Sequence, residues 1–344
     1  MNKPILVLKF GTASITTAQG ELDETVIREV ARQVAQIQKQ YHIVLVSSGA
    51  VAAGRSYLKN YAGTLSDKKA AAAIGNPMLL NKYSQYFAPY GIALAQSLCE
   101  RHHFSNRNQF LQLKSTYEKL WANNIIPIAN ENDVVSNLEL KFSDNDELAT
   151  LIAVGFNASL LLFSTSVPGV LDKVGAVIPQ LDTLDKNVLL LANKEKSASG
   201  LGGMTSKLTF ARLANMMGIK SVIFGVRTED GILKAIDGRT GTLCLPQPST
   251  LPARKRWLAS GSLVKGKLKI DAGAESALQK RRSLLAVGVQ QISGEFEQGE
   301  VFEILDENEN TIAVAKAKIS SSALQDNLKT QNLEVANAND IVLL

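Results

Sequence analysis

A glycine-rich segment that leads into a lysine is the strongest chemical pattern in the sequence. Residues 197–207 read SASGLGGMTSK, and a helix is predicted over residues 204–217. Glycines leave backbone N–H groups accessible, a helix N-terminus carries partial positive charge, and Lys207 adds a mobile cation. Together these groups suit the phosphates of a nucleotide, although a flexible surface loop has a similar composition.

A second candidate lies where the first predicted strand, residues 5–9, ends. Lys9 closes this apolar run and is followed by Phe10, Gly11 and Thr12. In open α/β sheets, ligands bind at the carboxyl ends of the strands. Gly11 has no Cβ that would keep a phosphate away from the backbone. Taken alone, Lys9 could also be a solvated lysine before an ordinary turn.

Three more segments place small or polar residues at the ends of predicted strands or the starts of predicted helices. Residues 47–55 read SSGAVAAGR, whose small side chains expose backbone N–H groups to an anion. Residues 130–133 read NEND, whose side chains could bind an ammonium group or hold a turn. Residues 143–147 read SDNDE, which could cap a helix or supply a carboxylate that orients lysines. The chain has neither a G-x-x-x-x-G-K-[ST] loop nor a G-x-G-x-x-G after its first strand.

Short apolar runs alternate with amphipathic stretches over the first 245 residues. Buried strands are predicted at residues 5–9, 43–47, 92–98, 125–129, 160–164 and 221–226. Helices are predicted at 23–39 with Asp23 as N-cap, and at 67–74, 77–87, 113–123, 144–154 and 204–217. Residues 134–142 alternate like an exposed hairpin. Continuous apolar strands between helices predict an α/β fold with a mainly parallel sheet covered on both faces.

This rhythm ends at a proline-rich stretch. Residues 246–253 read PQPSTLPA, which is typical of a linker. Beyond it, short strands are predicted at residues 267–270, 284–286, 289–292, 301–305 and 311–317. We therefore predict a first domain at 1–245, a linker at 246–253 and a small β-rich domain at 254–344.

Composition and charge narrow the functional classes. The 344 residues are 45% hydrophobic and 20% charged, as in ordinary globular proteins. The formal net charge of +5 suits anionic substrates but is too small to require nucleic acid. Residues 252–344 hold 12 Lys+Arg and 12 Asp+Glu, which leaves 25 against 20 in the first 251 residues. The basic excess lies in the part that carries the phosphate-type segments.

The two cysteines and the apolar runs bear on the cellular compartment. Cys99 and Cys244 are far apart and lack metal-type spacing, so we expect buried thiols in a reducing compartment. The apolar run at residues 5–9 is too short for the core of a signal peptide, and no apolar run approaches membrane-spanning length. A cytoplasmic protein that does not enter a membrane is expected.

Taken together and in this order, the five segments resemble the amino acid kinase family, and within it the glutamate 5-kinases. The matching stretches are residues 9–12 (KFGT), 48–55 (SGAVAAGR), 130–133 (NEND), 144–146 (DND) and 200–207 (GLGGMTSK). Residues 254–257 (RKRW) and 266–274 (GKLKIDAGA) look like the PUA domain that many bacterial members carry. The resemblance covers nearly the whole chain. It implies a three-layer α/β sandwich followed by a small β-rich PUA-like barrel.

The resemblance implies ATP-dependent phosphorylation of the γ-carboxylate of L-glutamate, the first step of proline biosynthesis. In that reading, Lys9 and Lys207 flank the transferring phosphoryl group and Asp146 holds both lysines in place. The attacking carboxylate is already ionised at neutral pH, so no general base is needed.

Substrate contacts are also implied by the resemblance. Ser48, Asp133 and Asn145 would bind glutamate, with Asp133 facing its α-ammonium group. The expected nucleotide contacts are Lys9, Gly11, Thr165, Ser166, Leu201, Gly202, Gly203, Met204, Thr205, Ser206 and Lys207. Mg²⁺ would bridge the phosphates, with no protein side chain assigned as its ligand. Thr165-Ser166 departs from the family, which often has Thr-Asp there, so a carboxylate is missing at that nucleotide contact.

Partners follow from the same resemblance. They are ATP, glutamate, proline as a feedback inhibitor, glutamyl phosphate reductase as the next enzyme, and further copies of the chain in a dimer or tetramer. Two alternatives remain open. One is a kinase of the same fold for another acceptor, such as acetylglutamate, aspartate, carbamate or uridylate. The other is an RNA-binding regulatory protein that acts through the PUA-like tail.

Overall fold

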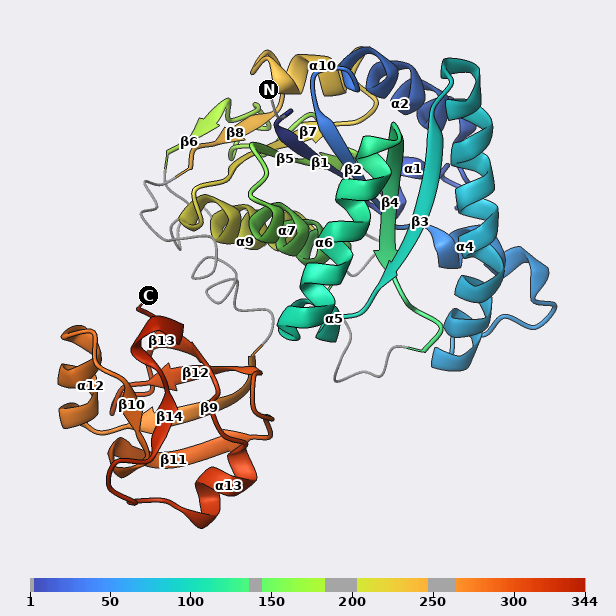
Figure 1. Cartoon of the computed structure of the whole chain (residues 1–344). Coiled ribbons are helices and arrows are strands. Elements are labelled where there is room, and N and C mark those ends of the chain that lie inside the picture. The colour runs from blue at the N-terminus through green and yellow to red at the C-terminus, as the bar shows by residue number, and fades with distance from the viewer. Residues whose placement is uncertain (1–2, 136–143, 183–202, 247–263, 344) are drawn as a thin grey trace. The chain divides into compact units, whose positions relative to one another are not determined.

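The structure, a computed structural model, describes residues 3–135, 144–182, 203–246 and 264–343 (Figure 1). The chain divides into two compact units, one of residues 1–100 with 114–249 and one of residues 101–113 with 250–344. Most of the predicted linker and of the predicted hairpin at 134–142 lies outside the described residues. The predicted domain boundaries therefore stay predictions, and each unit is described by itself.

One large sheet organises the first unit. Its order across the described residues is β3-β4-β2-β1-β5-β7-β8-β6. The strands are β1 (Ile5–Phe10), β2 (His42–Ser47), β3 (Ala93–Cys99), β4 (Ile125–Glu131), β5 (Leu160–Thr165), β6 (Gln180–Leu181), β7 (Lys220–Gly225) and β8 (Thr242–Cys244). Neighbouring strands are parallel except for β7 and β8. The predicted mainly parallel sheet is confirmed, and β1 lies between β2 and β5.

Helices cover both faces of this sheet (Figure 1). The longer ones are α2 (Glu24–Ile37), α4 (Leu65–Phe87), α6 (Arg107–Ala122), α7 (Asn145–Phe156), α9 (Met204–Met216) and α10 (Gly231–Ile236). Short helical segments are α1 (Thr12–Ile15), α3 (Ala50–Gly54), η1 (Arg55–Tyr57) and η2 (Ala88–Tyr90). The short helix α5 (His102–Ser105) and the first residues of α6, up to residue 113, are grouped with the second unit. Helices α2, α4 and α10 share one apolar core with the sheet, while α7 and α9 lie over its other face. The result is the predicted three-layer sandwich.

Successive residues of β1 face opposite layers, as in any strand. Leu6, Leu8 and Phe10 are buried in the core shared with α2 and α4. Lys9 has the opposite parity, and its ammonium group contacts a carboxylate of α7. The apolar run of β1 therefore ends with its one cation buried between sheet and helix, only 3% exposed.

Helix α4 corrects one prediction from the sequence. Separate helices were expected at 67–74 and 77–87, but a single helix, Leu65–Phe87, passes through Pro77. Thr64 and Asp67 start it with reciprocal side-chain to backbone hydrogen bonds, a capping box. An interior proline removes one backbone hydrogen bond and normally breaks or kinks a helix. Here the burial of α4 against the rest of the unit outweighs that loss.

Close contact between α3 and α4 depends on two glycines. A Cβ on Gly75 would lie 1.7 Å from the carbonyl oxygen of Ala50, and one on Gly54 would lie 2.0 Å from that of Ala71. Neither glycine has positive φ, so the requirement is for space and not for an unusual backbone conformation. The two backbones can approach this closely only because both side chains are absent.

Replacing Gly75 with alanine should therefore destabilise the protein, although alanine is the better helix former by about 1 kcal/mol. Forced separation of packed elements typically costs about 1–3 kcal/mol. We expect a lower midpoint of thermal unfolding, measured by circular dichroism. Ala73→Ser, at an exposed position of the same helix, serves as control and should change the midpoint little. A midpoint for Gly75→Ala at or above that of the wild type would contradict the close contact.

The second unit is built on a sheet of order β11-β9-β12-β13-β15, with a separate pair β10-β14. The strands are β9 (Val264–Ile270), β10 (Leu284–Leu285), β11 (Val289–Gly294), β12 (Val301–Leu305), β13 (Thr311–Lys316), β14 (Glu334–Ala336) and β15 (Ile341–Leu343). Short helices α12 (Ala272–Gln279), η4 (Ala286–Gly288), α13 (Ser321–Asp326) and η5 (Ala338–Asp340) connect them. The predicted β-rich character is confirmed. Helices α12 and α13, capped by Asp271 and Ser320, were not predicted.

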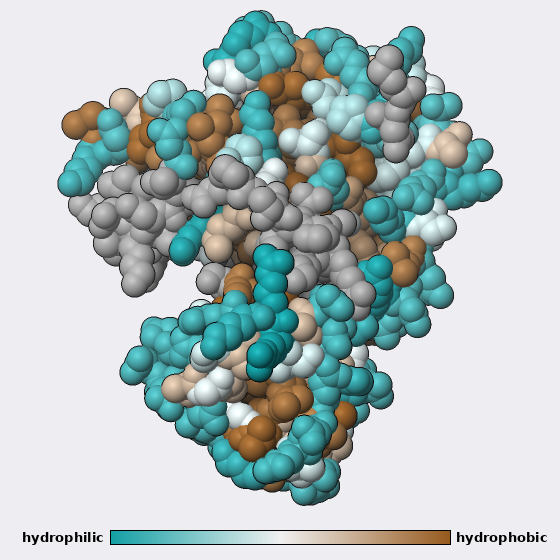
Figure 2. Space-filling view, turned by 60° about the vertical axis from the view of Figure 1, so that its left-hand side comes forward, coloured by the Kyte–Doolittle hydropathy of each residue, from teal (hydrophilic) through white to brown (hydrophobic). Residues whose placement is uncertain are grey.

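Each unit has its own apolar core. In the second unit, buried residues such as Leu268, Phe302 and Ile304 form a cluster separate from that of the first. Cys99 and Cys244 are buried free thiols, as predicted. The face shown in Figure 2 is largely hydrophilic on each unit, with apolar residues gathered in smaller areas within each of them. Within the described part of the chain, no helix combines the length and apolarity needed to cross a membrane.

Candidate active site

Two lysines from distant parts of the sequence meet on one carboxylate. Lys9, at the end of β1, places its Nζ 2.5 Å from Oδ1 of Asp146. Lys207, in the first turns of α9, places its Nζ 3.2 Å from Oδ2 of the same residue. Asp146 is the second residue of α7 and is fully buried. The predicted catalytic trio is thus brought together, with one carboxylate oxygen for each ammonium group.

Burial and charge act against each other in this trio. Burial alone would raise the pKa of Asp146, but the two lysine ammonium groups lower that pKa below its ordinary value. For Lys9, burial is the largest effect and lowers its pKa, with Lys207 adding to the shift and Asp146 opposing it. Asp146 therefore keeps two like charges close together. An incoming phosphoryl group would meet both of them without any rearrangement of the protein.

The start of α9 is joined to the start of α7 by a second contact. Asp144 caps α7, and its Oδ1 accepts hydrogen bonds from the backbone N–H groups of Asp146 at 2.8 Å and Glu147 at 3.2 Å. Its Oδ2 accepts a hydrogen bond from the hydroxyl of Ser206. Burial, and then the nearby charge of Asp146, raise the pKa of Asp144. The pairing of Asp144 with Ser206 holds Lys207 over Asp146.

The N-terminus of α9 suits an anion. Its N-cap is Gly203, which has no side chain to accept hydrogen bonds from the first backbone N–H groups. The first turn contains no acidic residue. Gly11 occupies the equivalent N-cap position of α1, where a Cβ would lie 3.4 Å from the Nζ of Lys9. Glycines thus cap the helices that start beside Lys9 and Lys207, and the predicted contact of Gly11 and Gly203 with a nucleotide stays a prediction.

A chain of amide side chains leads away from the trio. The Nδ2 of Asn145 donates to Ser48 Oγ at 2.8 Å and to Asn130 Oδ1 at 2.9 Å. Ser48 follows β2 directly, and its backbone N–H donates to the carbonyl of Phe10 at 2.9 Å. The Oδ1 of Asn145 is buried and has no hydrogen-bond partner among the described residues. Asn145 precedes Asp146 at the start of α7, so the same helix turn carries this unused acceptor and the carboxylate that pairs with Lys9 and Lys207.

The structure places other predicted site residues after β4, at the end of β5 and at the start of α9. Asp133 lies in the turn after β4 and is half-buried. Thr165 ends β5, and its carbonyl accepts a hydrogen bond from the backbone of Val226 at 3.1 Å. Ser166 is exposed. Met204 and Thr205 begin α9 beside Ser206. Leu201 and Gly202 lie outside the described residues, so their predicted contact with a nucleotide stays a prediction.

The sequence did not single out three residues that the structure connects to this site: Asp144, Asn130, and Asn76, whose Oδ1 accepts a hydrogen bond of 2.9 Å from the Nδ2 of Asn130. Asp144 was included in a segment predicted to cap a helix or to orient lysines, and Asn130 in a segment predicted to bind an ammonium group or hold a turn, but neither received a role of its own. Asn76 was missed because it lies in a stretch predicted as a break between helices. One signal was available: Asn76 is a polar residue four positions after Ala72 and seven before Tyr83, on what proves to be the buried face of α4.

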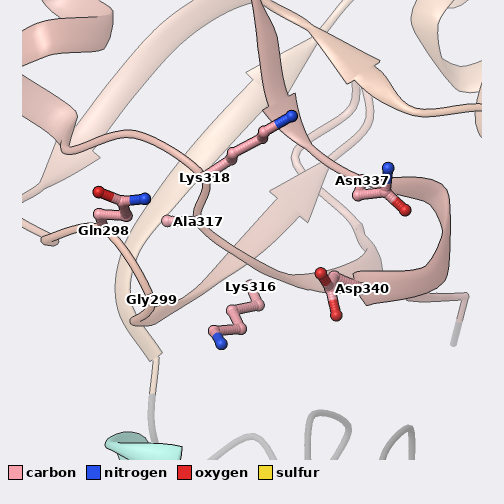
Figure 3. A pocket seen from close by; sticks show the side chains of 7 residues that line it. All are labelled: Gln298, Gly299, Lys316, Ala317, Lys318, Asn337 and Asp340. Atoms are coloured by element: carbon pink, nitrogen blue, oxygen red, sulfur yellow. The ribbon is translucent and has the colours of Figure 1, made fainter.

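A separate pocket of about 470 Å³ opens in the second unit. Gln298, Lys316, Lys318, Asn337 and Asp340 are among its lining residues. Figure 3 shows that the two lysine side chains point in different directions. The Nζ of Lys318 is paired with Glu334, so the lining does not present one concentrated positive charge. Among the described residues, no three His, Cys, Asp or Glu side chains gather in a way that could hold a metal ion.

Solved structures share the fold of the first unit at low sequence identity. A carbamate kinase from Giardia lamblia bound to AMP-PNP superposes with a TM-score of 0.52 and 19% identity, covering 71% of this chain and 99% of that one. A UMP kinase from Ureaplasma parvum gives a TM-score of 0.50 and 15% identity, covering 71% and 97%. At such identities the likeness establishes the fold alone.

Comparison of the sequence with known proteins identifies the family as well as the fold. A glutamate 5-kinase from Kosmotoga olearia is 39% identical over 304 residues, which cover 87% of this chain and 84% of that protein. A glutamate 5-kinase from Streptococcus suis is 34% identical over the full length of both chains. The PUA domain model matches residues 266–337. The amino acid kinase family model matches residues 4–225, the part that contains Lys9, Asp146 and Lys207. The chain belongs to the amino acid kinase family and carries a PUA domain after its kinase part.

Proposed function

We propose that the chain transfers the γ-phosphoryl group of ATP to the γ-carboxylate of L-glutamate. The observation that carries the proposal is the pair of lysines held on Asp146 at the carboxyl end of the central strand. Relatives that are 34–39% identical over most of their length are glutamate 5-kinases, which supports glutamate as the acceptor. The product, a mixed acid anhydride, would enter proline biosynthesis.

In this reaction one carboxylate oxygen of glutamate forms a bond to the γ-phosphorus while the bond from that phosphorus to the β,γ-bridging oxygen breaks. ADP leaves with the electron pair of the broken bond. Phosphoryl transfer of this kind depends mainly on positioning and charge stabilisation. Lys9 and Lys207 would neutralise the charge on the transferring group from two sides. The carboxylate nucleophile is ionised at neutral pH, so no side chain has to remove a proton.

Substrate binding divides between the two ends of the site in our proposal. Ser48, Asn145 and Asp133 bind glutamate. Asp133 faces its α-ammonium group, and the unused Oδ1 of Asn145 is a second acceptor for that group. The starts of α1 and α9 bind the phosphates of ATP, with residues 201–207, Thr165 and Ser166 as further nucleotide contacts. Both oxygens of Asp146 are already paired with lysines, so we assign Mg²⁺ to the phosphates and not to a set of side chains.

The proposal extends to the organisation and setting of the protein. Residues 1–245 would form the catalytic domain, 246–253 the linker and 254–344 the PUA domain. We propose a cytoplasmic homo-oligomer, a dimer or tetramer, that is inhibited by proline. The acyl phosphate product is unstable in water, so glutamyl phosphate reductase would have to take it up promptly.

Trapping the product with hydroxylamine tests the proposal directly. Hydroxylamine converts an acyl phosphate to a coloured hydroxamate, so the assay reports the chemical step itself. With ATP and Mg²⁺, we expect hydroxamate from glutamate and none from N-acetylglutamate, aspartate or a blank without acceptor. Product from another acceptor would keep the kinase chemistry and refute the substrate. No product from any acceptor, with folded protein, would refute the proposal.

A further inference from the structure

We propose that Asn76, in the middle of α4, is a positioning residue for the acceptor site. Its side chain is 4% exposed, and its Oδ1 accepts a hydrogen bond of 2.9 Å from the Nδ2 of Asn130. Asn130 in turn bonds to Asn145, one of the residues proposed to bind glutamate. The inference rests on the proposed function, because it concerns how that acceptor is held.

The hydrogen bonds of Asn130 all have a defined direction. Its Nδ2 donates to Asn76, while its Oδ1 accepts from the Nδ2 of Asn145 and from the backbone N–H of Glu131, both at 2.9 Å. If the amide of Asn130 were turned over, an NH₂ group would face two donors. The oxygen of Asn76 therefore helps to keep the oxygen of Asn130 directed at Asn145.

That direction determines what Asn145 can offer to a ligand. An amide nitrogen carries two hydrogens, and those of Asn145 are both used, one by Ser48 and one by Asn130. Its Oδ1 must then point away from both partners, and it is the buried acceptor without a partner among the described residues. Through Asn130, Asn76 thus fixes which atom of Asn145 is available to an ammonium group.

The packing of α4 explains how Asn76 reaches this network. Gly75, the preceding residue, allows α4 to touch the backbone of α3, which starts just after Ser48 and Gly49. Seven residues further along, the hydroxyl of Tyr83 is 3.1 Å from that of Ser47 in a second buried hydrogen bond. Helix α4 is therefore bonded to the carboxyl ends of both β2 and β4, the two strands that lead into the acceptor site.

A purely structural role does not account for an asparagine at this position. The Nδ2 of Asn76 is buried and has no partner among the described residues. An unsatisfied buried donor usually lowers stability by about 1–3 kcal/mol, so an apolar side chain would serve packing better. The asparagine makes sense if the orientation of Asn130 matters more than that loss.

The test compares Asn76→Leu with the wild type in steady-state kinetics. Loss of the hydrogen bond to Asn130 should raise the KM for glutamate about tenfold, while the KM for ATP and kcat change by less than about threefold. Asn76→Asp, which keeps an accepting oxygen of the same shape, should return the KM for glutamate most of the way to its wild-type value. A merely structural role would not produce this split between the two substrates.

Asn215→Leu is the matched control. Asn215 is similarly buried, at 5% exposure, and its Oδ1 accepts one hydrogen bond from Ser221 at 3.0 Å, away from this network. We expect it to lower stability but leave the KM for glutamate unchanged. If Asn76→Leu does not fold, Asn76→Ala replaces it in the same comparison.

Two outcomes would overturn the inference: an unchanged KM for glutamate in the Asn76 variant, or equal rises in both KM values. Failure of the proposed function looks different, because the wild type itself would then give no hydroxamate from glutamate.

Discussion

Replacing Lys207 with alanine should lower kcat for glutamate phosphorylation by about 10²–10³-fold, the usual effect of removing one group that stabilises transition-state charge. The Nζ of Lys207 is 3.2 Å from Asp146 and is held there by the contact of Ser206 with Asp144. No second cation among the described contacts can take its place, since Lys9 already occupies the other oxygen of Asp146. Hydroxamate formation at saturating ATP and glutamate measures the effect.

Lys220→Ala is the control for this prediction. Lys220 is the first residue of β7 and lies at the opposite end of the strand from the proposed site. The Lys220→Ala protein should keep kcat within about twofold of the wild type, because the half-buried Lys220 lies far from the proposed site. Near-normal turnover in Lys207→Ala would exclude the assigned role of Lys207.

Asp146→Asn should have the other large effect, on stability and catalysis together. Removing one partner from a buried ion pair typically destabilises a protein by about 3–5 kcal/mol, since the opposite charge is left buried and unpaired. Here two ammonium groups, those of Lys9 and Lys207, would lose their shared carboxylate. We expect a clearly lower midpoint of thermal unfolding and a fall in kcat of at least about 10²-fold.

Activity and stability of the Asp146→Asn protein should each depend on pH differently from those of the wild type. Asp146 raises the pKa of Lys9 against the lowering effect of burial, so the Asn variant should have a still lower Lys9 pKa. Its residual activity should therefore decline at a lower pH on the alkaline side than that of the wild type. The difference in unfolding free energy between the wild type and Asp146→Asn should instead change on the acidic side. Because the folded-state pKa of Asp146 is depressed, its contribution is present above the ordinary value of 3.8 and is lost as pH falls through the lower folded value.

The matched control for this variant is Asp172→Asn. Asp172 lies in a turn, where its side chain accepts hydrogen bonds from the backbone of Val174 and Ala176. It should change neither the alkaline limb of the activity profile nor kcat. An Asp146→Asn protein with wild-type stability and an unshifted alkaline limb would show that the carboxylate does not hold the two lysines.

The elements that could be predicted from sequence are those whose pattern is local. The apolar run of β1 and the N-cap Asp23 of α2 are visible in single stretches, and both are confirmed. The continuous helix α4 was not predicted, because a proline by itself normally breaks a helix. The packing that stabilises α4, such as the contact of Gly75 with Ala50, involves a segment about 25 residues away and leaves no local pattern. Helices as short as α13 have too few residues for a periodic pattern to emerge.

The site shows the same division. Lys9, Asp146 and Lys207 were each recognisable by type and neighbours, and their resemblance to a family linked them. The ion pairs that join them could not be predicted from the sequence, because they form only where β1, α7 and α9 meet at one edge of the sheet. Asn76 was invisible for a related reason. Nothing near it in sequence marks it as a partner of Asn130, 54 positions later.

The two buried cysteines have a practical consequence for following motions of the sheet. Cys99 ends β3 at one edge, while Cys244 ends β8 next to the other. Burial raises the pKa of Cys99 to about 11 and that of Cys244 to about 12, so almost no thiolate exists at neutral pH in the closed state. Alkylating reagents attack thiolates, and each cysteine can therefore be labelled only when its own strand opens. The rate at which an alkylating reagent labels Cys99 or Cys244 therefore reports how often β3 or β8 opens locally, without any introduced probe.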